Sequence, residues 1–269
     1  MSPELVAAII AASVSVLTLI GSVAAQIYGI RKTSRDTEKT LKEQREQLDK
    51  TLREQSKQLD RTLAEQRART LNERFATAAD KLGSDKPPAV RLAGVYAMAG
   101  LADDWEENRQ TCVDVLCAYL RLPYERDPGD DAPAAERLAF RGSREVRHTV
   151  IRVITAHLRG DALSWQGLNF DFSGVVFDGG QVSFSGVSFS GGRVSFSGVN
   201  FSGGQVSFEE AKFSGSQVNF NGAKFSGGQV SFGVAEFSGG QVDFRGAEFS
   251  GGQVDFRGAE FSGSQVNFI

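Results

Sequence analysis

The sequence predicts an α-helical N-terminal part followed by a C-terminal β-solenoid. Three observations carry this prediction: a run without charge at residues 5–30, leucines at an eleven-residue step within residues 31–70, and an aromatic ladder that begins at Trp165. A continuous helix explains the first two features, and a fixed repeat of alternating side chains explains the third. The chain therefore divides into a membrane helix, a helical stalk, a small all-α domain at 71–159 and a solenoid at 160–269.

Composition narrows the classes of function. The net charge is −3 and the isoelectric point is about 5.6, so there is no general attraction to nucleic acid. Cys112 and Cys117 are five apart on an expected helix and point in different directions, which predicts two buried free thiols. The only histidines are His148 and His157, and no CxxC or HExxH motif occurs. The sequence therefore predicts no metal, no cofactor and no catalytic residue.

Residues 5–30 are expected to cross a membrane. At about 1.5 Å per residue, a helix of this length exceeds the roughly 30 Å of a bilayer core. Arg31, Lys32 and Arg35 follow the run, whereas Glu4 precedes it. Because basic residues favour the cytoplasmic side, the pattern predicts a single-pass protein of the inner or plasma membrane. The lipid bilayer would then be one partner, and the bulk of the chain would be cytoplasmic.

The charged stretch at 31–70 is expected to form a helical coiled-coil stalk. Its leucines form two interleaved series with eleven-residue steps, which is 3.67 residues per turn and close to the natural helix period. The predicted seam comprises Leu41, Leu48, Leu52, Leu59 and Leu63. A thin leucine stripe on a charged helix has little to pack on except another copy, so the stalk predicts a homo-oligomer. An isolated helix stabilised by ion pairs is the alternative.

Residues 71–159 read as a small helical domain. Helices are expected near 89–102, from Thr111, where "TCVD" resembles a capping box, and near 143–159. The stretch "NERFATAADKLGSDKPPAVRLAGVYAMAGLADD" with "TCVDVLCAYLR" resembles a helical region that precedes pentapeptide repeats in bacterial membrane-tethered proteins, particularly actinobacterial ones. This resemblance implies a family and no particular chemistry.

The aromatic ladder predicts the solenoid. Its spacing alternates between five and seven residues, and a Val or Ala usually stands two positions before each aromatic residue. Inside, outside, inside is the alternation of a β-strand, and the glycines between strands allow turns. The predicted core comprises Trp165, Phe172, Phe177, Phe184, Phe189, Phe196, Phe201, Phe208, Phe213, Phe220, Phe225, Phe232, Phe237, Phe244, Phe249, Phe256 and Phe261.

The stretch "VDFRG-AEFSG" resembles two units of the pentapeptide-repeat family, which implies a right-handed four-sided β-helix over about 161–269. This sequence adds two residues after every second unit, so a coil could hold four strands in 24 residues or two in 12. A 12-residue coil would stack Lys212 on Lys224 and Glu236 on Glu248, which is unfavourable. A 24-residue coil places Glu236 beside Lys212 and therefore fits better.

These features favour a non-enzymatic, membrane-anchored scaffold that presents a rigid solenoid to an unidentified protein partner. Some pentapeptide-repeat proteins mimic DNA and occupy a topoisomerase, which is one alternative. Residues 161–269 carry ten acidic and five basic residues, a balance less acidic than such mimicry requires. An exported surface-interaction solenoid is the other alternative. Nucleic acid is not favoured as a partner.

The end of the repeat is a further candidate for contact between copies. The sequence closes on "SQVNFI" without a helix or a charged segment to cover the last coil. Repeat proteins ordinarily cover such ends with a polar cap. We therefore expect Phe268 and Ile269 to form an end-to-end interface, which the resemblance to dimeric pentapeptide-repeat proteins also implies. A frayed last coil is the alternative.

Overall fold

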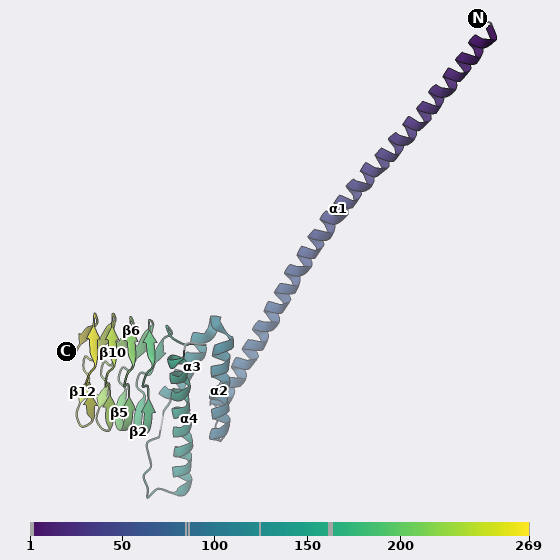
Figure 1. The fold of residues 1–269 in the computed structure, drawn as a ribbon. Coiled ribbons are helices and arrows are strands. Elements are labelled where there is room, and N and C mark those ends of the chain that lie inside the picture. Colours follow the sequence, from purple (N-terminus) through teal and green to yellow (C-terminus); the bar gives the residue numbers. More distant parts are fainter. Residues whose placement is uncertain (1–2, 84, 86, 124, 161–163, 269) are drawn as a thin grey trace. The chain divides into compact units, whose positions relative to one another are not determined.

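The computed structural model divides the chain into two compact units, Met1–Ala68 and Arg69–Ile269 (Figure 1). Each unit is described by itself. The structure describes residues 3–83, 85, 87–123, 125–160 and 164–268, except for the side chains of residues 4–14 and 30–36.

Helices come first in the chain and short strands follow. The helices are α1 Pro3–Gly83, α2 Pro88–Asp104, the 3₁₀ helix η1 Glu106–Asn108, α3 Arg109–Arg121 and α4 Ala134–Arg159. The strands are β1 Phe170–Asp171, β2 Val176–Ser183, β3 Ser188–Ser190, β4 Arg193–Ser195, β5 Asn200–Ser207, β6 Lys212–Ser214, β7 Gln217–Asn219, β8 Lys224–Phe225, β9 Gln229–Ser231, β10 Glu236–Ser238, β11 Gln241–Asp243, β12 Glu248–Phe249, β13 Gln253–Asp255, β14 Glu260–Ser262 and β15 Gln265–Asn267. This order agrees with the predicted sequence of a helical part and a solenoid.

The first unit is the N-terminal part of α1. Among the residues that the structure describes, no helix combines the length and the apolar character needed to cross a membrane. The prediction of a membrane-spanning helix at 5–30 is therefore wrong, and so is the single-pass membrane localisation that rested on it. The prediction relied on the absence of charge, but the run includes Ser15, Thr18 and Ser22 and continues without a break into charged turns of the same helix.

The helical part of the second unit is built around α2, α3 and α4. Its core includes Val95, Met98, Leu116, Val150 and Ile154, all fully buried. Both cysteines are free and buried, as predicted. Helices α2, α3 and α4 pack against one another, and this packing sets the position of the solenoid that follows.

Two helix starts differ from the prediction. Helix α3 begins at Arg109 without a side-chain cap, because η1 already turns the backbone before Thr111. Helix α4 begins at Ala134 rather than near residue 143. Gly142 lies inside α4 because a Cβ atom there would come within 2.4 Å of Pro88 Cγ. The glycine therefore permits a close approach between two helices and does not mark a break.

The solenoid has a 24-residue coil. In the sheet β14-β10-β6-β3, Phe237 pairs with Phe213 on one side and with Phe261 on the other, all in parallel register. A second sheet has the order β1-β4-β7-β11-β15. The third follows the order β12-β8-β5-β9-β13 and covers two faces, because β2 and β5 each continue around a corner. The coil therefore has four sides, and the two-sided alternative is wrong; the right-handed sense stays a prediction.

Helices α3 and α4 cover the first coil (Figure 1). An open solenoid end exposes unpaired backbone donors and acceptors, so it needs a cover. Gln110 of α3 accepts from the Asn169 N–H and donates to the Asn169 carbonyl, each at 2.9 Å. Arg159 of α4 donates to the Ser185 carbonyl at 2.5 Å. Long polar side chains thus take the place of a preceding coil.

Candidate functional site

The interior of the solenoid consists of columns with one side chain from each coil. Phe220 stacks between Phe196 and Phe244, with ring centroids 4.9 and 4.8 Å apart. Phe232 meets Phe220 edge to face, with centroids 5.6 Å apart and an interplanar angle of 85°. Such contacts bury large apolar areas and exclude water. The columns are a source of stability and offer no polar group for chemistry.

The structure places most members of the predicted ladder in this interior. Trp165, Phe172, Phe177, Phe184, Phe189, Phe196, Phe201, Phe208, Phe213, Phe220, Phe225, Phe232, Phe237 and Phe244 are buried. Phe256 is partly buried, whereas Phe249 and Phe261 are 49% and 42% exposed. Phe170, which the ladder omits, is also buried and pairs with Val194 in the next coil. Its position two residues before Phe172, where other units carry Val, is the signal that could have identified it.

Two sets of residues were predicted to contact a second copy of the chain. Phe268 is 56% exposed and stacks on Phe244 with centroids 5.1 Å apart, whereas Ile269 lies outside the described residues. The stalk leucines are between 53% and 59% exposed in the single chain. They are Leu41, Leu48, Leu52, Leu59 and Leu63. Both contacts between copies stay predictions.

Glutamine side chains form ordered columns on the outside of the solenoid. One column comprises Gln181, Gln205, Gln229 and Gln253. Each amide donates from Nε2 to the Oε1 atom of the next coil, at 3.1, 3.1 and 3.4 Å in turn. Half a coil away, Gln241 donates to Gln265 in the same way at 3.1 Å. Because one N–H and one lone pair on each amide satisfy a neighbour, the remaining donors and acceptors point in fixed directions.

Local ion pairs neutralise two carboxylates at the corners. Arg245 lies 2.6 Å from Asp243, and Arg257 lies 2.7 Å from Asp255. The hydrogen bonds from the arginine side chains lower the pKa of both carboxyl groups. Each pair joins residues two positions apart in the chain, so the charge is balanced within one corner.

Further ion pairs join adjacent coils. Lys212 Nζ lies 3.7 Å from Glu236, and Lys224 Nζ lies 4.0 Å from Glu248. Glu260 follows Glu236 in the same column. Basic residues therefore interrupt the acidic ones, and the described faces of the solenoid carry no unbroken acidic strip of the kind that DNA mimicry requires.

A polar cluster fastens the helical part to the start of the solenoid. Trp165 Nε1 donates to Asp103 Oδ1 at 3.0 Å, and His157 Nε2 lies 3.2 Å from Asp103 Oδ2. His157 stacks on Trp165 with centroids 4.1 Å apart, and its Nδ1 lies 2.7 Å from the Val153 carbonyl. The sequence gave no signal for this cluster, because its members come from distant parts of the chain. Since the cluster satisfies both ring nitrogens of His157, it acts as a fastening.

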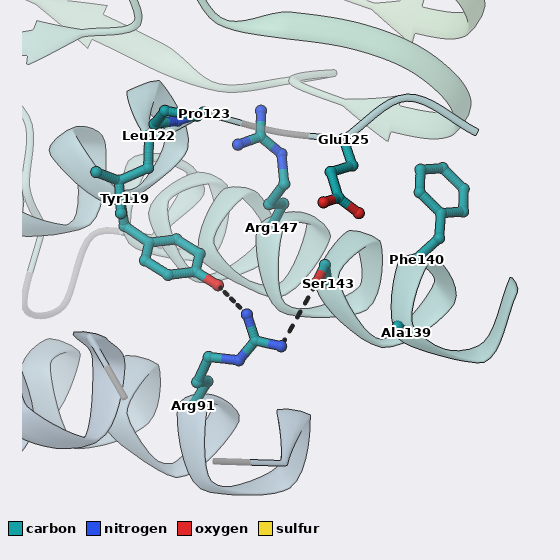
Figure 2. Close-up of a pocket in the computed structure, with 9 residues that line it drawn as sticks. All are labelled: Arg91, Tyr119, Leu122, Pro123, Glu125, Ala139, Phe140, Ser143 and Arg147. Atoms are coloured by element: carbon teal, nitrogen blue, oxygen red, sulfur yellow. Dashed lines mark hydrogen bonds between the residues drawn. The ribbon is translucent and has the colours of Figure 1, made fainter. Parts of the chain in front are cut away.

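A cavity of about 310 Å³ lies among α2, α3, α4 and the segment that joins α3 to α4 (Figure 2). The residues that line it are Arg91, Tyr119, Leu122, Pro123, Glu125, Ala139, Phe140, Ser143 and Arg147. Arg91 donates to the Tyr119 hydroxyl and to the Ser143 hydroxyl, each at 3.4 Å. None of these residues was predicted as a site, because only the packing of three helices brings them together.

The described residues contain no group of three His, Cys, Asp or Glu side chains that could hold a metal ion. Burial raises the pKa of the Cys112 thiol to about 11 and that of the Cys117 thiol to about 12. At neutral pH both thiols are therefore protonated and are poor nucleophiles. Chemistry in the described part of the chain is thus confined to binding by hydrogen bonds and charge.

Comparison with known proteins identifies the repeat. Residues 208–260 match the family model described as pentapeptide repeats (9 copies). No curated protein and no solved structure matches the chain. The match and the four-sided solenoid together support a pentapeptide-repeat protein.

Proposed function

We propose that this pentapeptide-repeat protein is a non-enzymatic scaffold whose solenoid faces bind a protein partner. Pentapeptide-repeat proteins are generally structural or interaction proteins without catalytic activity. The observation that supports the proposal most directly is the glutamine column from Gln181 to Gln253. A regular, polar and rigid surface of this kind is suited to recognition rather than to reaction.

The glutamine column lowers the cost of binding. Ordering an exposed, flexible side chain at an interface costs about 0.5–1.5 kcal/mol. In the column, Gln205 and Gln229 are already held by neighbours, so a partner meets side chains that have lost part of this freedom. Ser207 and Ser231 occupy the neighbouring outward positions on the same face and add hydroxyl groups. The partner would supply complementary amide or hydroxyl groups at the spacing of the coils, about 4.8 Å.

The stalk would increase the number of solenoids that a partner meets. Parallel association through the leucine stripe from Leu41 to Leu63 places several solenoids on one assembly. Weak binding by each copy then adds up, because the later contacts form at a high effective concentration. The exposure of these leucines in the single chain supports this role.

Site-specific photo-crosslinking in the native cell tests the proposal. A photoreactive amino acid replaces Gln229 in the glutamine column, and a matched variant carries it at Ser238 on another face. We expect a discrete crosslinked protein, identified by mass spectrometry, from position 229 and not from position 238. The purified partner must then bind the full chain and bind a Gln205→Ala, Gln229→Ala variant at least about 10-fold more weakly, a loss of about 1.4 kcal/mol.

Two results would contradict the proposal. Identical crosslinked products from both faces would indicate nonspecific contact. A purified candidate whose affinity does not change when Gln205 and Gln229 are replaced would exclude the glutamine column as its binding surface.

A further inference from the structure

The cavity between α2, α3 and α4 has the properties of a small-molecule site. We propose that it binds a small molecule that carries a phosphate or carboxylate group, and that Arg91 is the principal ligand of that group. The proposal is independent of the solenoid faces, because every residue that lines the cavity belongs to the helical part. Its volume of about 310 Å³ is at the lower end of the range of about 300–1,000 Å³ for such sites.

Arg91 is poorly satisfied by the protein. Its two printed partners, the hydroxyls of Tyr119 and Ser143, are neutral and lie at the long distance of 3.4 Å. Its Nε atom is buried without a hydrogen-bond partner among the described residues. A buried charged donor is costly unless it is paired, and an oxyanion is the partner that a guanidinium fork fits best. An oxyanion in the cavity would therefore satisfy the donors that the protein leaves weakly bonded.

The two hydroxyls extend the donor set. A guanidinium can only donate, so the oxygens of Tyr119 and Ser143 act as acceptors toward Arg91. Their own O–H hydrogens are then left to donate to a third group. Figure 2 shows Arg91 reaching toward Tyr119 on one side and Ser143 on the other. Donors from three helices thus converge on one part of the cavity.

The charge of the lining favours an anion. Arg91 and Arg147 contribute two positive charges and Glu125 contributes one negative charge, which leaves +1. Arg147 is 7% exposed, and its donation to the Leu120 carbonyl at 2.7 Å holds it in place. It therefore adds to the field in the cavity without having to move. Glu125 opposes the anion and sets a limit on its affinity.

The remaining lining accommodates an uncharged part of the ligand. Phe140, Leu122 and Ala139 present apolar surface to the same cavity. A molecule with an anionic group at one end and a small apolar or aromatic body at the other would contact both kinds of wall. Phenyl phosphate combines these two features and serves as a probe.

Titration calorimetry on the full chain, with inorganic phosphate, acetate and phenyl phosphate as probes, tests the proposal. We expect saturable binding of at least one probe and at least about 10-fold weaker binding to Arg91→Gln, since a charge-assisted bond is lost. Arg141→Gln is the matched control, because Arg141 is exposed on the same helix as Ser143 and does not line the cavity. Glu125→Gln should tighten binding, because it removes the opposing charge.

The choice of probes separates the ligand classes. Binding of phosphate or phenyl phosphate without acetate assigns a phosphate group, and the reverse assigns a carboxylate. The proposal is overturned if no probe binds saturably to the unaltered chain, or if Arg91→Gln and Arg141→Gln weaken binding equally. Circular dichroism checks the fold of each variant. Should Arg91→Gln unfold, Tyr119→Phe and Ser143→Ala decide the question, and unchanged affinity in both would overturn the proposal.

Discussion

Lys212 and Glu236 are 24 residues apart and lie side by side in neighbouring coils, with Nζ 3.7 Å from Oε1. The pair fixes the length of the coil in chemical terms. A coil of half that length would have placed Lys212 next to Lys224. The column continues from Glu236 to Glu260, where two like charges are neighbours.

Reversing one charge in this column should weaken the solenoid slightly. Lys212→Glu places three acidic residues in succession, and we expect a loss of about 0.2–1 kcal/mol in the free energy of unfolding. Chemical denaturation at low salt measures the loss, which should shrink in high salt because exposed charges are screened. The double variant Lys212→Glu, Glu236→Lys exchanges the charges and should recover part of the loss. A loss that salt does not change would argue against a charge effect.

Truncation of a ring should cost less near the end of a column than in its middle. Phe225 is fully buried, whereas Phe249, which stacks on it, is 49% exposed. We expect Phe225→Ala to lower the free energy of unfolding by about 3–5 kcal/mol through lost burial and a cavity. Phe249→Ala removes the same group from a half-exposed site and should cost less. Equal losses in denaturant melts would contradict the assignment of the interior.

One turn carries a residue that its backbone disfavours. Val234 has φ +55°, in a turn position that glycine occupies in other coils. The left-handed conformation costs about 1–2 kcal/mol, and a glycine costs about 0.5–1 kcal/mol in chain entropy. Val234→Gly should therefore raise the melting temperature. Gly222, with φ +65° and open space around a Cβ atom, provides the reverse control, and Gly222→Val should lower it.

The buried thiols should make stability depend on alkaline pH. Burial raises the pKa of Cys112 to about 11 and that of Cys117 to about 12, from 9.0. Between these values the folded chain holds protons that the unfolded chain releases. The stabilisation is therefore present below pH 9 and lost as the pH rises toward 12.

Thermal melts between pH 8 and pH 12 measure this loss. The variant with Cys112→Ala and Cys117→Ala should lose stability less steeply than the unaltered chain over the same range. Identical slopes would exclude a contribution from the thiols. A thiol reagent at pH 8 provides an independent measurement, because it should react only after unfolding.

Charges in the leucine stripe should prevent self-association. Replacing Leu48, Leu52 and Leu59 with Lys in the full chain introduces three like charges into the predicted seam. Light scattering should then report a lower mass than for the unaltered chain at micromolar concentration. The control variant carries Lys at Gln47, Thr51 and Gln58, which lie on another face of the helix. An unaltered chain that is already monomeric would contradict the proposed clustering.

The repeat could be predicted in detail because its signal is local. The alternation of five and seven residues between Phe237, Phe244 and Phe249 specifies which side chains face inward, and the Lys212 column selects the longer coil. Phe170 escaped the prediction because it replaces Val at its position, so the ladder of regular spacing passes over it. Periodic features therefore transfer from sequence to structure, and exceptions to the period do not.

Features that depend on packing between distant segments had no such signal. Asp103, His157 and Trp165 meet only when α2, α4 and the first coil come together. The cavity around Arg91 has the same origin. The membrane prediction failed for a different reason, since it was based on missing charges rather than on the full apolar character of a helix.

The two glutamine columns bear on how the solenoid could lengthen. They lie half a coil apart, so duplication of a single 12-residue unit would rotate everything beyond it by half a turn and exchange one column for the other. The aromatic interior would remain filled, but Lys212 would come to lie beside a second lysine. Duplication of 24 residues keeps both the interior and the pairing of opposite charges. Growth of the gene by whole coils is therefore the path on which each intermediate protein remains as stable as its parent.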